Sequence, residues 1–139
     1  MYKNEFDNYL KQNKKFKAYM FYGQSIFLVE QYALVIAQSL GNDDEIEKLY
    51  FEEYDFKYTK DKLLQSSLFS SNNIILIKLD KKIPKKEVDS LIEACNLNPD
   101  STLIFACLGD SDFKTMEASF SLKTNSAAVR FFLPTDTEA

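Results

Sequence analysis

The sequence has no histidine and no tryptophan, and its 139 residues include only three glycines, three prolines and two cysteines. Without histidine, the chain lacks the commonest general base and the commonest metal ligand. Cys95 and Cys107 lie far apart and match no zinc or redox spacing. We therefore expect two core thiols in a reducing compartment, and neither a metal nor a cofactor.

The sequence also lacks an apolar run long enough to span a membrane, and no apolar h-region of a signal peptide follows Met1. We therefore expect a cytoplasmic protein with no membrane partner. Positive charge is scarce as well, because 17 lysines and arginines face 21 aspartates and glutamates, which gives a net charge of −4. Since binding to nucleic-acid phosphates requires a basic face, we expect this chain to meet DNA only indirectly.

Short apolar runs alternate along the chain with segments in which apolar residues recur at helical spacing. Strands that alternate with helices indicate a parallel sheet with right-handed crossovers and helices on both of its faces. The sequence therefore predicts an α/β fold, a doubly wound three-layer domain with a five-stranded parallel sheet. The strands are expected at Ala18–Tyr22, Leu49–Phe51, Ile74–Leu79, Thr102–Leu108 and Val129–Leu133.

The helices are expected before, between and after these strands. Gly41 stands where a helix commonly ends in a left-handed residue, and Thr59 is a suitable N-cap for the helix that follows it. The helices are expected around Phe6–Leu10, over Ile26–Leu40, from Lys60 onward, from Pro84 through Ala94, and from a cap at Asp112 through Phe120.

The first strand, Gly23 and the next helix stand where a phosphate-binding loop would stand. A functional loop has a glycine, four further residues, and then Gly-Lys followed by Ser or Thr. Here Leu28, Val29 and Glu30 occupy those last three places. The leucine blocks the close approach of phosphate, the valine cannot reach it, and the carboxylate repels it. The sequence therefore predicts a degenerate P-loop without nucleotide hydrolysis.

Two other functions compete with a binding role. The first is a P-loop-like nucleotide-binding enzyme, a small hydrolase or kinase, and the three lost loop residues are the evidence against it. The second is a receiver-like signalling domain that would use Asp80 and Lys123. Its first strand would have to end in acidic residues, whereas this one ends in Tyr22-Gly23.

Two large apolar residues stand between pairs of serines in Ser66-Ser67-Leu68-Phe69-Ser70-Ser71. If the preceding helix continues this far with Leu63 and Leu64 on its inward side, Phe69 points away from the core. In the other interpretation the helix ends near Ser67, and the apolar pair packs beneath the next strand. Spacing alone favours this second interpretation.

Four features of this sequence occur together. A strand is followed by Tyr22-Gly23-Gln24 and then by residues 27–30, and Ser67-Leu68-Phe69-Ser70 stands directly before the strand at 74–77. The strand at 102–105 follows Pro99-Asp100, and Val129-Arg130-Phe131-Phe132 belongs to the expected final strand. On these features the chain resembles the N-terminal domain of the delta subunit of bacterial DNA polymerase III, the clamp-loader subunit that opens the sliding clamp. In that family a Leu-Phe pair enters an apolar pocket of the clamp, so the resemblance favours an exposed role for Leu68 and Phe69, with Ser67 and Ser70 at the rim.

The resemblance implies a RecA-like AAA+ fold with a degenerate P-loop over residues 1–133. Residues 134–139 would begin a linker to lid and collar domains that this sequence does not contain. The implied partners are the sliding clamp (the beta subunit) and, through the missing domains, other clamp-loader subunits. No catalysis is expected in this domain, although the whole assembly is a DNA-directed DNA polymerase, a nucleotidyltransferase, in DNA replication.

Overall fold

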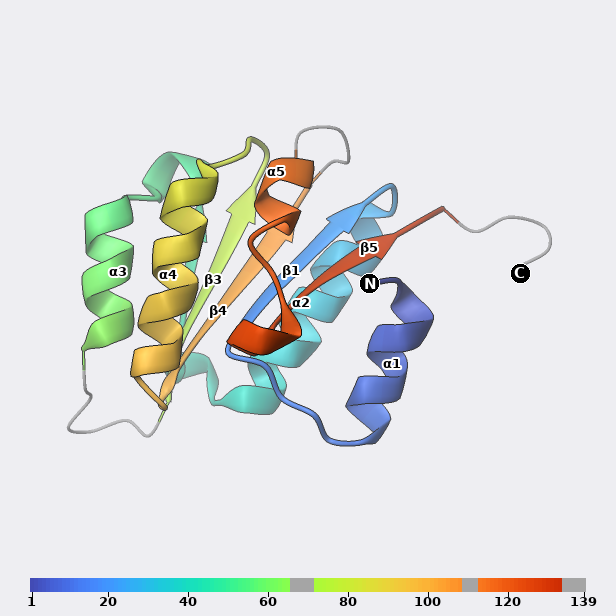
Figure 1. Ribbon diagram of the computed structural model, residues 1–139, viewed down its shortest axis with the longest axis horizontal. Coiled ribbons are helices and arrows are strands. Elements are labelled where there is room, and N and C mark those ends of the chain that lie inside the picture. The colour runs from blue at the N-terminus through green and yellow to red at the C-terminus, as the bar shows by residue number, and fades with distance from the viewer. Residues whose placement is uncertain (66–71, 109–112, 134–139) are drawn as a thin grey trace.

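A parallel sheet forms the middle layer of the protein in the computed structural model, which describes residues 1–65, 72–108 and 113–133 (Figure 1). Within these residues the sheet has five strands in the order β2-β3-β4-β1-β5, and every neighbouring pair is parallel. The predicted α/β class is therefore confirmed. The strands are β1 (Ala18–Gly23), β2 (Ile46–Tyr50), β3 (Asn73–Leu79), β4 (Ser101–Cys107) and β5 (Ser126–Phe131).

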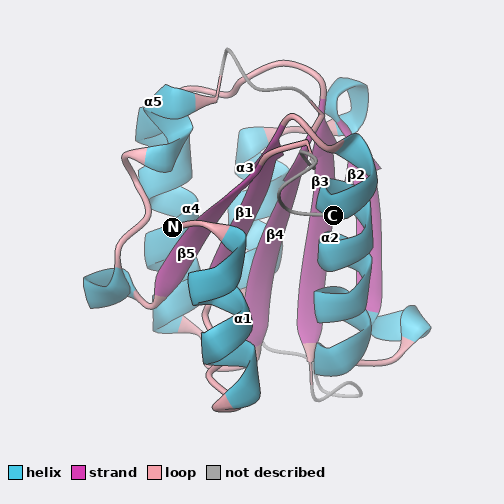
Figure 2. Cartoon of the chain, turned by 90° about the vertical axis from the view of Figure 1, so that its right-hand side faces the viewer, coloured by secondary structure: helices cyan, strands magenta, loops and turns pink. Residues whose placement is uncertain are grey.

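Helices cover both faces of the sheet, which confirms the three-layer arrangement (Figure 2). The first face carries α1 (Lys3–Lys11) and α2 (Ile26–Leu40). The second face carries α3 (Phe56–Leu64), α4 (Lys85–Leu97) and the short α5 (Lys114–Glu117). No helix in the described part of the chain is both long enough and apolar enough to cross a membrane.

Alternating strand residues build two separate cores, one on each face, because successive side chains of a strand point to opposite sides. Tyr19 and Phe21 of β1 pack beneath α1 and α2, whereas Met20 and Tyr22 pack beneath the helices of the other face. Phe6 fastens α1 to the first core, since its buried ring lies 5.4 Å from the ring of Phe21. Burying such a side chain contributes about 1.5–3 kcal/mol, so α1 is an integral part of the domain.

Two expected helix ends are wrong. Gly41 follows α2 with φ −171°, which is extended backbone and not the left-handed conformation. The N-cap of α3 is Asp55, whose carboxylate accepts a hydrogen bond of 2.8 Å from the amide of Tyr58. Thr59 lies inside α3, where it is buried and its hydroxyl donates to the carbonyl oxygen of Asp55.

Two strands begin earlier than the apolar runs predicted. β2 starts at Ile46 and β5 starts at Ser126, in each case three residues before the expected position. β2 is an edge strand whose residues are only half-buried or exposed, so apolar residues do not mark its full length. Asp112, the expected cap of the fifth helix, lies outside the described residues, and α5 begins directly after Phe113.

Both cysteines lie where the sequence places them. Cys95 is in α4 and Cys107 is in β4, and both are buried free thiols of the same core. Burial raises the pKa of the Cys95 thiol to about 12 and that of Cys107 well above its ordinary value. Both are therefore protonated, unreactive core residues at neutral pH.

Candidate functional site

The connection between β1 and α2 is too short to be a phosphate loop. β1 ends at Gly23 and α2 begins at Ile26, so that only Gln24 and Ser25 lie between strand and helix. A functional loop needs four residues between its two glycines before the helix begins. The three places that would carry Gly-Lys-Ser, residues 28–30, therefore lie inside α2 and not on a loop.

The side chains at these three places face in different directions. Val29 is fully buried in the core between α2 and the sheet, so a longer side chain here would enter the core and not a phosphate site. Leu28 is half-buried. Glu30 is exposed, and its carboxylate lies 3.9 Å from the ammonium of Lys78. These residues do not converge on a common ligand.

Backbone groups of the turn bind other parts of the chain. The amide of Gln24 donates to the carbonyl oxygen of Phe131 at 2.8 Å, and the Ser25 hydroxyl accepts from the amide of Leu28 at 3.3 Å. Gly23 has φ +127°, and a Cβ built there would lie 2.1 Å from the carbonyl oxygen of Phe131. Gly23 is therefore required by the close packing of β1 against β5, without any role for phosphate.

Ligands of open α/β sheets bind at the carboxyl edge where the strand order reverses, which here lies between β1 and β4. At this edge the hydroxyl of Tyr22 donates to the carboxylate of Glu117 in α5 at 2.5 Å. Asp80, which directly follows β3, is exposed. Across the described ranges, no group of histidine, cysteine, aspartate and glutamate side chains is arranged to hold a metal ion.

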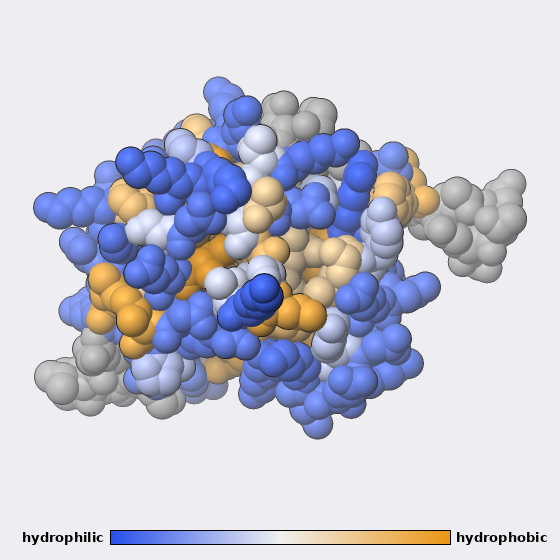
Figure 3. Space-filling view, in the orientation of Figure 1, coloured by the Kyte–Doolittle hydropathy of each residue, from blue (hydrophilic) through white to orange (hydrophobic). Residues whose placement is uncertain are grey.

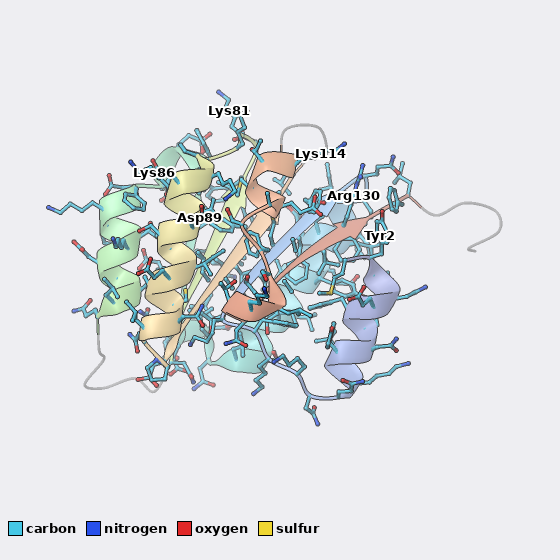
Figure 4. The ribbon with its side chains drawn as sticks, in the orientation of Figure 1. Tyr2, Lys81, Lys86, Asp89, Lys114 and Arg130 are labelled. Atoms are coloured by element: carbon cyan, nitrogen blue, oxygen red, sulfur yellow. The ribbon has the colours of Figure 1, made fainter. Side chains whose placement is uncertain are left out.

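The single arginine, Arg130, belongs to β5, as the sequence predicts. It forms an isolated parallel bridge with Tyr2 at the edge of the sheet, and the two side chains lie close together (Figure 4). The guanidinium carbon lies 5.0 Å from the ring centroid of Phe132. Contacts of this kind are typical of cation–π packing on the protein's own surface.

The second candidate site is the segment with the Leu-Phe pair. Ser67, Leu68, Phe69 and Ser70 lie outside the described residues, but the structure describes the chain on either side of them. α3 ends at Leu64, and the next residue has φ −77° and ψ 128°, which is extended backbone. α3 therefore does not continue beyond Leu64, and the condition for the first of the two interpretations is not met.

The expectation that Leu64 lies on the inward side of α3 is also wrong. Leu63 is fully buried, whereas Leu64 is 41% exposed and Leu97, the last residue of α4, is 69% exposed. Hydrophobic side chains gather over the lower ends of α3 and α4 in the space-filling view (Figure 3). Exposed apolar residues that gather in this way are typical of surfaces that contact other proteins.

Three polar side chains hold the end of α3 at the amino edge of the sheet. Asn73 donates to the carbonyl oxygen of Lys62 at 2.6 Å, and Ser101 donates to that of Leu63 at 2.6 Å. Asn98 donates to the carbonyl oxygen of Leu63 as well. The last carbonyls of a helix have no partner within the helix, so these bonds replace the usual glycine cap.

No pattern in the sequence pointed to these residues. The available signal was the end of α3, which is followed by Gln65 and two serines and by no glycine. A helix that ends in this way needs donors from elsewhere, and asparagine is a suitable one. Local sequence patterns do not say where in the chain that asparagine is.

A family comparison places most of the chain in a known group. The family model described as "DNA polymerase III, delta subunit" matches residues 19–132. Two proteins from different strains of Helicobacter pylori are 28% and 26% identical to the chain, over 152 and 153 residues. Each alignment covers 96% of this chain and 44% of the relative, so the chain spans less than half the length of these relatives.

Two solved structures share the fold at low sequence identity. The DNA clamp loader delta protein of Bacillus subtilis is 15% identical and has a TM-score of 0.71, over 97% of this chain and 44% of that protein. A DNA polymerase III gamma subunit-related protein of Thermotoga maritima is 10% identical and has a TM-score of 0.56, over 96% of this chain and 47% of that protein. These likenesses confirm the fold expected from the sequence, a three-layer α/β domain around a five-stranded parallel sheet.

Proposed function

The chain belongs to the DNA polymerase III delta subunit family, and from this premise we propose that residues 1–133 are the clamp-binding domain of a clamp-loader subunit. Residues 134–139 would begin the linker to lid and collar domains. The observation that carries the proposal is the extent of the family match, because residues 19–132 include both the degenerate P-loop and the Leu-Phe segment.

In this proposal Leu68 and Phe69 enter an apolar pocket of the sliding clamp, and Ser67 and Ser70 hydrogen-bond at the rim. Burial of two such side chains is worth about 3–6 kcal/mol before the cost of ordering them. A closed ring must open to encircle DNA. A protein that binds the open ring more tightly than the closed ring shifts the equilibrium by that difference in affinity.

The short β1–α2 turn supports a domain that does not use ATP itself. The amide of Gln24 is bonded to Phe131 and the side chain of Val29 is buried, so neither this amide nor the position of the loop lysine is available to bind a phosphate. ATP chemistry would belong to neighbouring cytoplasmic subunits, reached through the missing domains. The domain then contributes to a DNA-directed DNA polymerase assembly without catalysis of its own. The same geometry counts against a P-loop-like nucleotide-binding enzyme.

A pair of titrations tests the proposal. The chain is titrated by calorimetry with the sliding clamp of the same organism and, separately, with magnesium-ATP. The proposal predicts saturable heat with the clamp and none with ATP. Binding of ATP with no binding of the clamp would overturn it in favour of the nucleotide-binding enzyme.

A further inference from the structure

The turn between α4 and β4, residues 98–100, and the first residue of β4, Ser101, hold the chain on both sides of the Leu-Phe segment. On one side, the side chains of Asn98 and Ser101 donate to carbonyl oxygens at the end of α3. On the other side, the carbonyl oxygen of Asp100 accepts a hydrogen bond of 2.8 Å from the amide of Asn73, the first residue of β3. One turn therefore fixes the point where the segment leaves α3 and the point where it enters the sheet.

Asn98 makes the largest number of these contacts. Its side-chain amide nitrogen donates to the carbonyl oxygens of Leu63 at 2.9 Å and Gln65 at 3.1 Å. Its side-chain oxygen accepts from the amide of Asp100 at 3.1 Å. The residue is 7% exposed, so these groups have little access to water. Gln65 directly precedes Ser66 in the sequence, so Asn98 holds the backbone from which the Leu-Phe segment continues.

The sheet in turn fixes the position of Asn98. The ammonium of Lys17, which directly precedes β1, donates to the carbonyl oxygens of Asn98 at 3.0 Å and Pro99 at 2.9 Å. The amide of Ser101 donates to the carbonyl oxygen of Asn98 at 3.2 Å. Both the side chain and the backbone of this residue are held, and its amide group is a rigid support for the end of α3.

We propose that Asn98 is a positioning residue for clamp binding, because it holds the backbone of Leu63 and Gln65, which directly precedes the Leu-Phe segment. This inference rests on the proposed function. Binding costs free energy when loops and side chains must be ordered, and a loop whose ends are already fixed loses less freedom. Asn98 need not touch the clamp to raise the affinity in this way.

The variant Asn98→Asp tests the proposal, because it keeps the shape and the acceptor for Asp100 but removes both donated bonds. Asn96→Asp is the matched control. Asn96 lies two residues earlier, in the last turn of α4, and also donates to two carbonyl oxygens, those of Ile92 at 3.1 Å and Thr124 at 2.7 Å, which are not at the end of α3. Each variant is titrated with the clamp at a temperature well below its own unfolding midpoint.

We expect Asn98→Asp to weaken clamp binding by about tenfold or more, and Asn96→Asp to change it by less than about twofold. A purely structural role would lower the unfolding midpoint of Asn98→Asp and leave the affinity of the folded protein unchanged. Should Asn98→Asp not fold, Ser101→Ala replaces it, since it removes the bond to Leu63. We then expect a loss of about threefold.

The failure of this inference is distinguishable from failure of the proposed function. If Leu68→Ala with Phe69→Ala abolishes clamp binding while Asn98→Asp or its substitute Ser101→Ala binds as tightly as the wild type, the positioning role is overturned and the proposed function stands. If the wild-type chain does not bind the clamp, both the proposed function and this inference are overturned.

Discussion

Replacing Gly23 with alanine tests whether this glycine serves the fold or a ligand. A Cβ at this position would lie 2.1 Å from the carbonyl oxygen and 2.7 Å from the amide nitrogen of Phe131. Both atoms belong to the backbone of β5, so no side-chain rotation relieves the contact. The carboxyl ends of β1 and β5 would have to separate.

The cost follows from what this separation breaks. An alanine at φ +127° is strained by about 1–3 kcal/mol. Loss of the hydrogen bond from Gln24 to Phe131 costs about 0.5–1.5 kcal/mol. Partial exposure of the buried Phe131 ring costs a share of the about 1.5–3 kcal/mol that its burial contributes. We therefore expect Gly23→Ala to lower the free energy of unfolding by about 3–5 kcal/mol.

Urea unfolding followed by circular dichroism measures this loss, and the thermal midpoint should fall by about 10 °C or more. Gly41→Ala is the control. Gly41 is extended, and its added Cβ would meet the ends of the Glu45 and Ile74 side chains, both at 2.8 Å, and the Cβ of Asn72 at an ordinary contact distance of 3.5 Å. These side chains can move, so we expect a cost below about 1 kcal/mol. If the two variants were equally stable, the structural role of Gly23 would be refuted.

Two further predictions concern the phosphate loop and the cysteines. The triple variant Leu28→Gly, Val29→Lys, Glu30→Ser restores the residue types of a functional loop. Calorimetric titration with magnesium-ATP should still show no heat of binding, because all three places lie inside α2. A micromolar dissociation constant would refute this. Ellman's reagent at about pH 8 should label Cys95 and Cys107 only after unfolding, because burial raises both thiol pKa values, and labelling of the folded protein would contradict their burial. Because burial raises the thiol pKa values of the folded state, keeping both thiols protonated stabilises the protein. This stabilisation is fully present below about pH 8.5 and is lost as the pH rises toward about 12. The urea midpoint should fall over the same pH range.

Much of the fold could be predicted because a parallel sheet buries whole strands. The strands β1, β3 and β4 are mostly apolar and almost entirely buried on both faces, and their expected positions agree closely with the structure. β2 could not be delimited in this way, because an edge strand needs apolar residues only where it meets the core. The helix caps failed for a related reason, since a residue suited to a cap, such as Thr59, is equally tolerated inside a helix.

The candidate site could be predicted less completely. The residues that fill the degenerate P-loop are visible in the sequence, but the missing loop itself is seen only once β1 and α2 have defined ends. The role of Asn98 could not be predicted at all. Its partners Leu63 and Gln65 are 35 and 33 residues away, and no local pattern joins positions so far apart.

The most direct test of the central claim is the clamp affinity of the variant Leu68→Ala with Phe69→Ala, measured together with its thermal stability. We expect binding to weaken by about 2–4 kcal/mol, as for anchor residues at an interface. We expect the unfolding midpoint to stay nearly unchanged, because exposed residues contribute little to stability. Full clamp affinity, or a much lower midpoint from a cavity in the core, would contradict the claim that this pair binds the clamp.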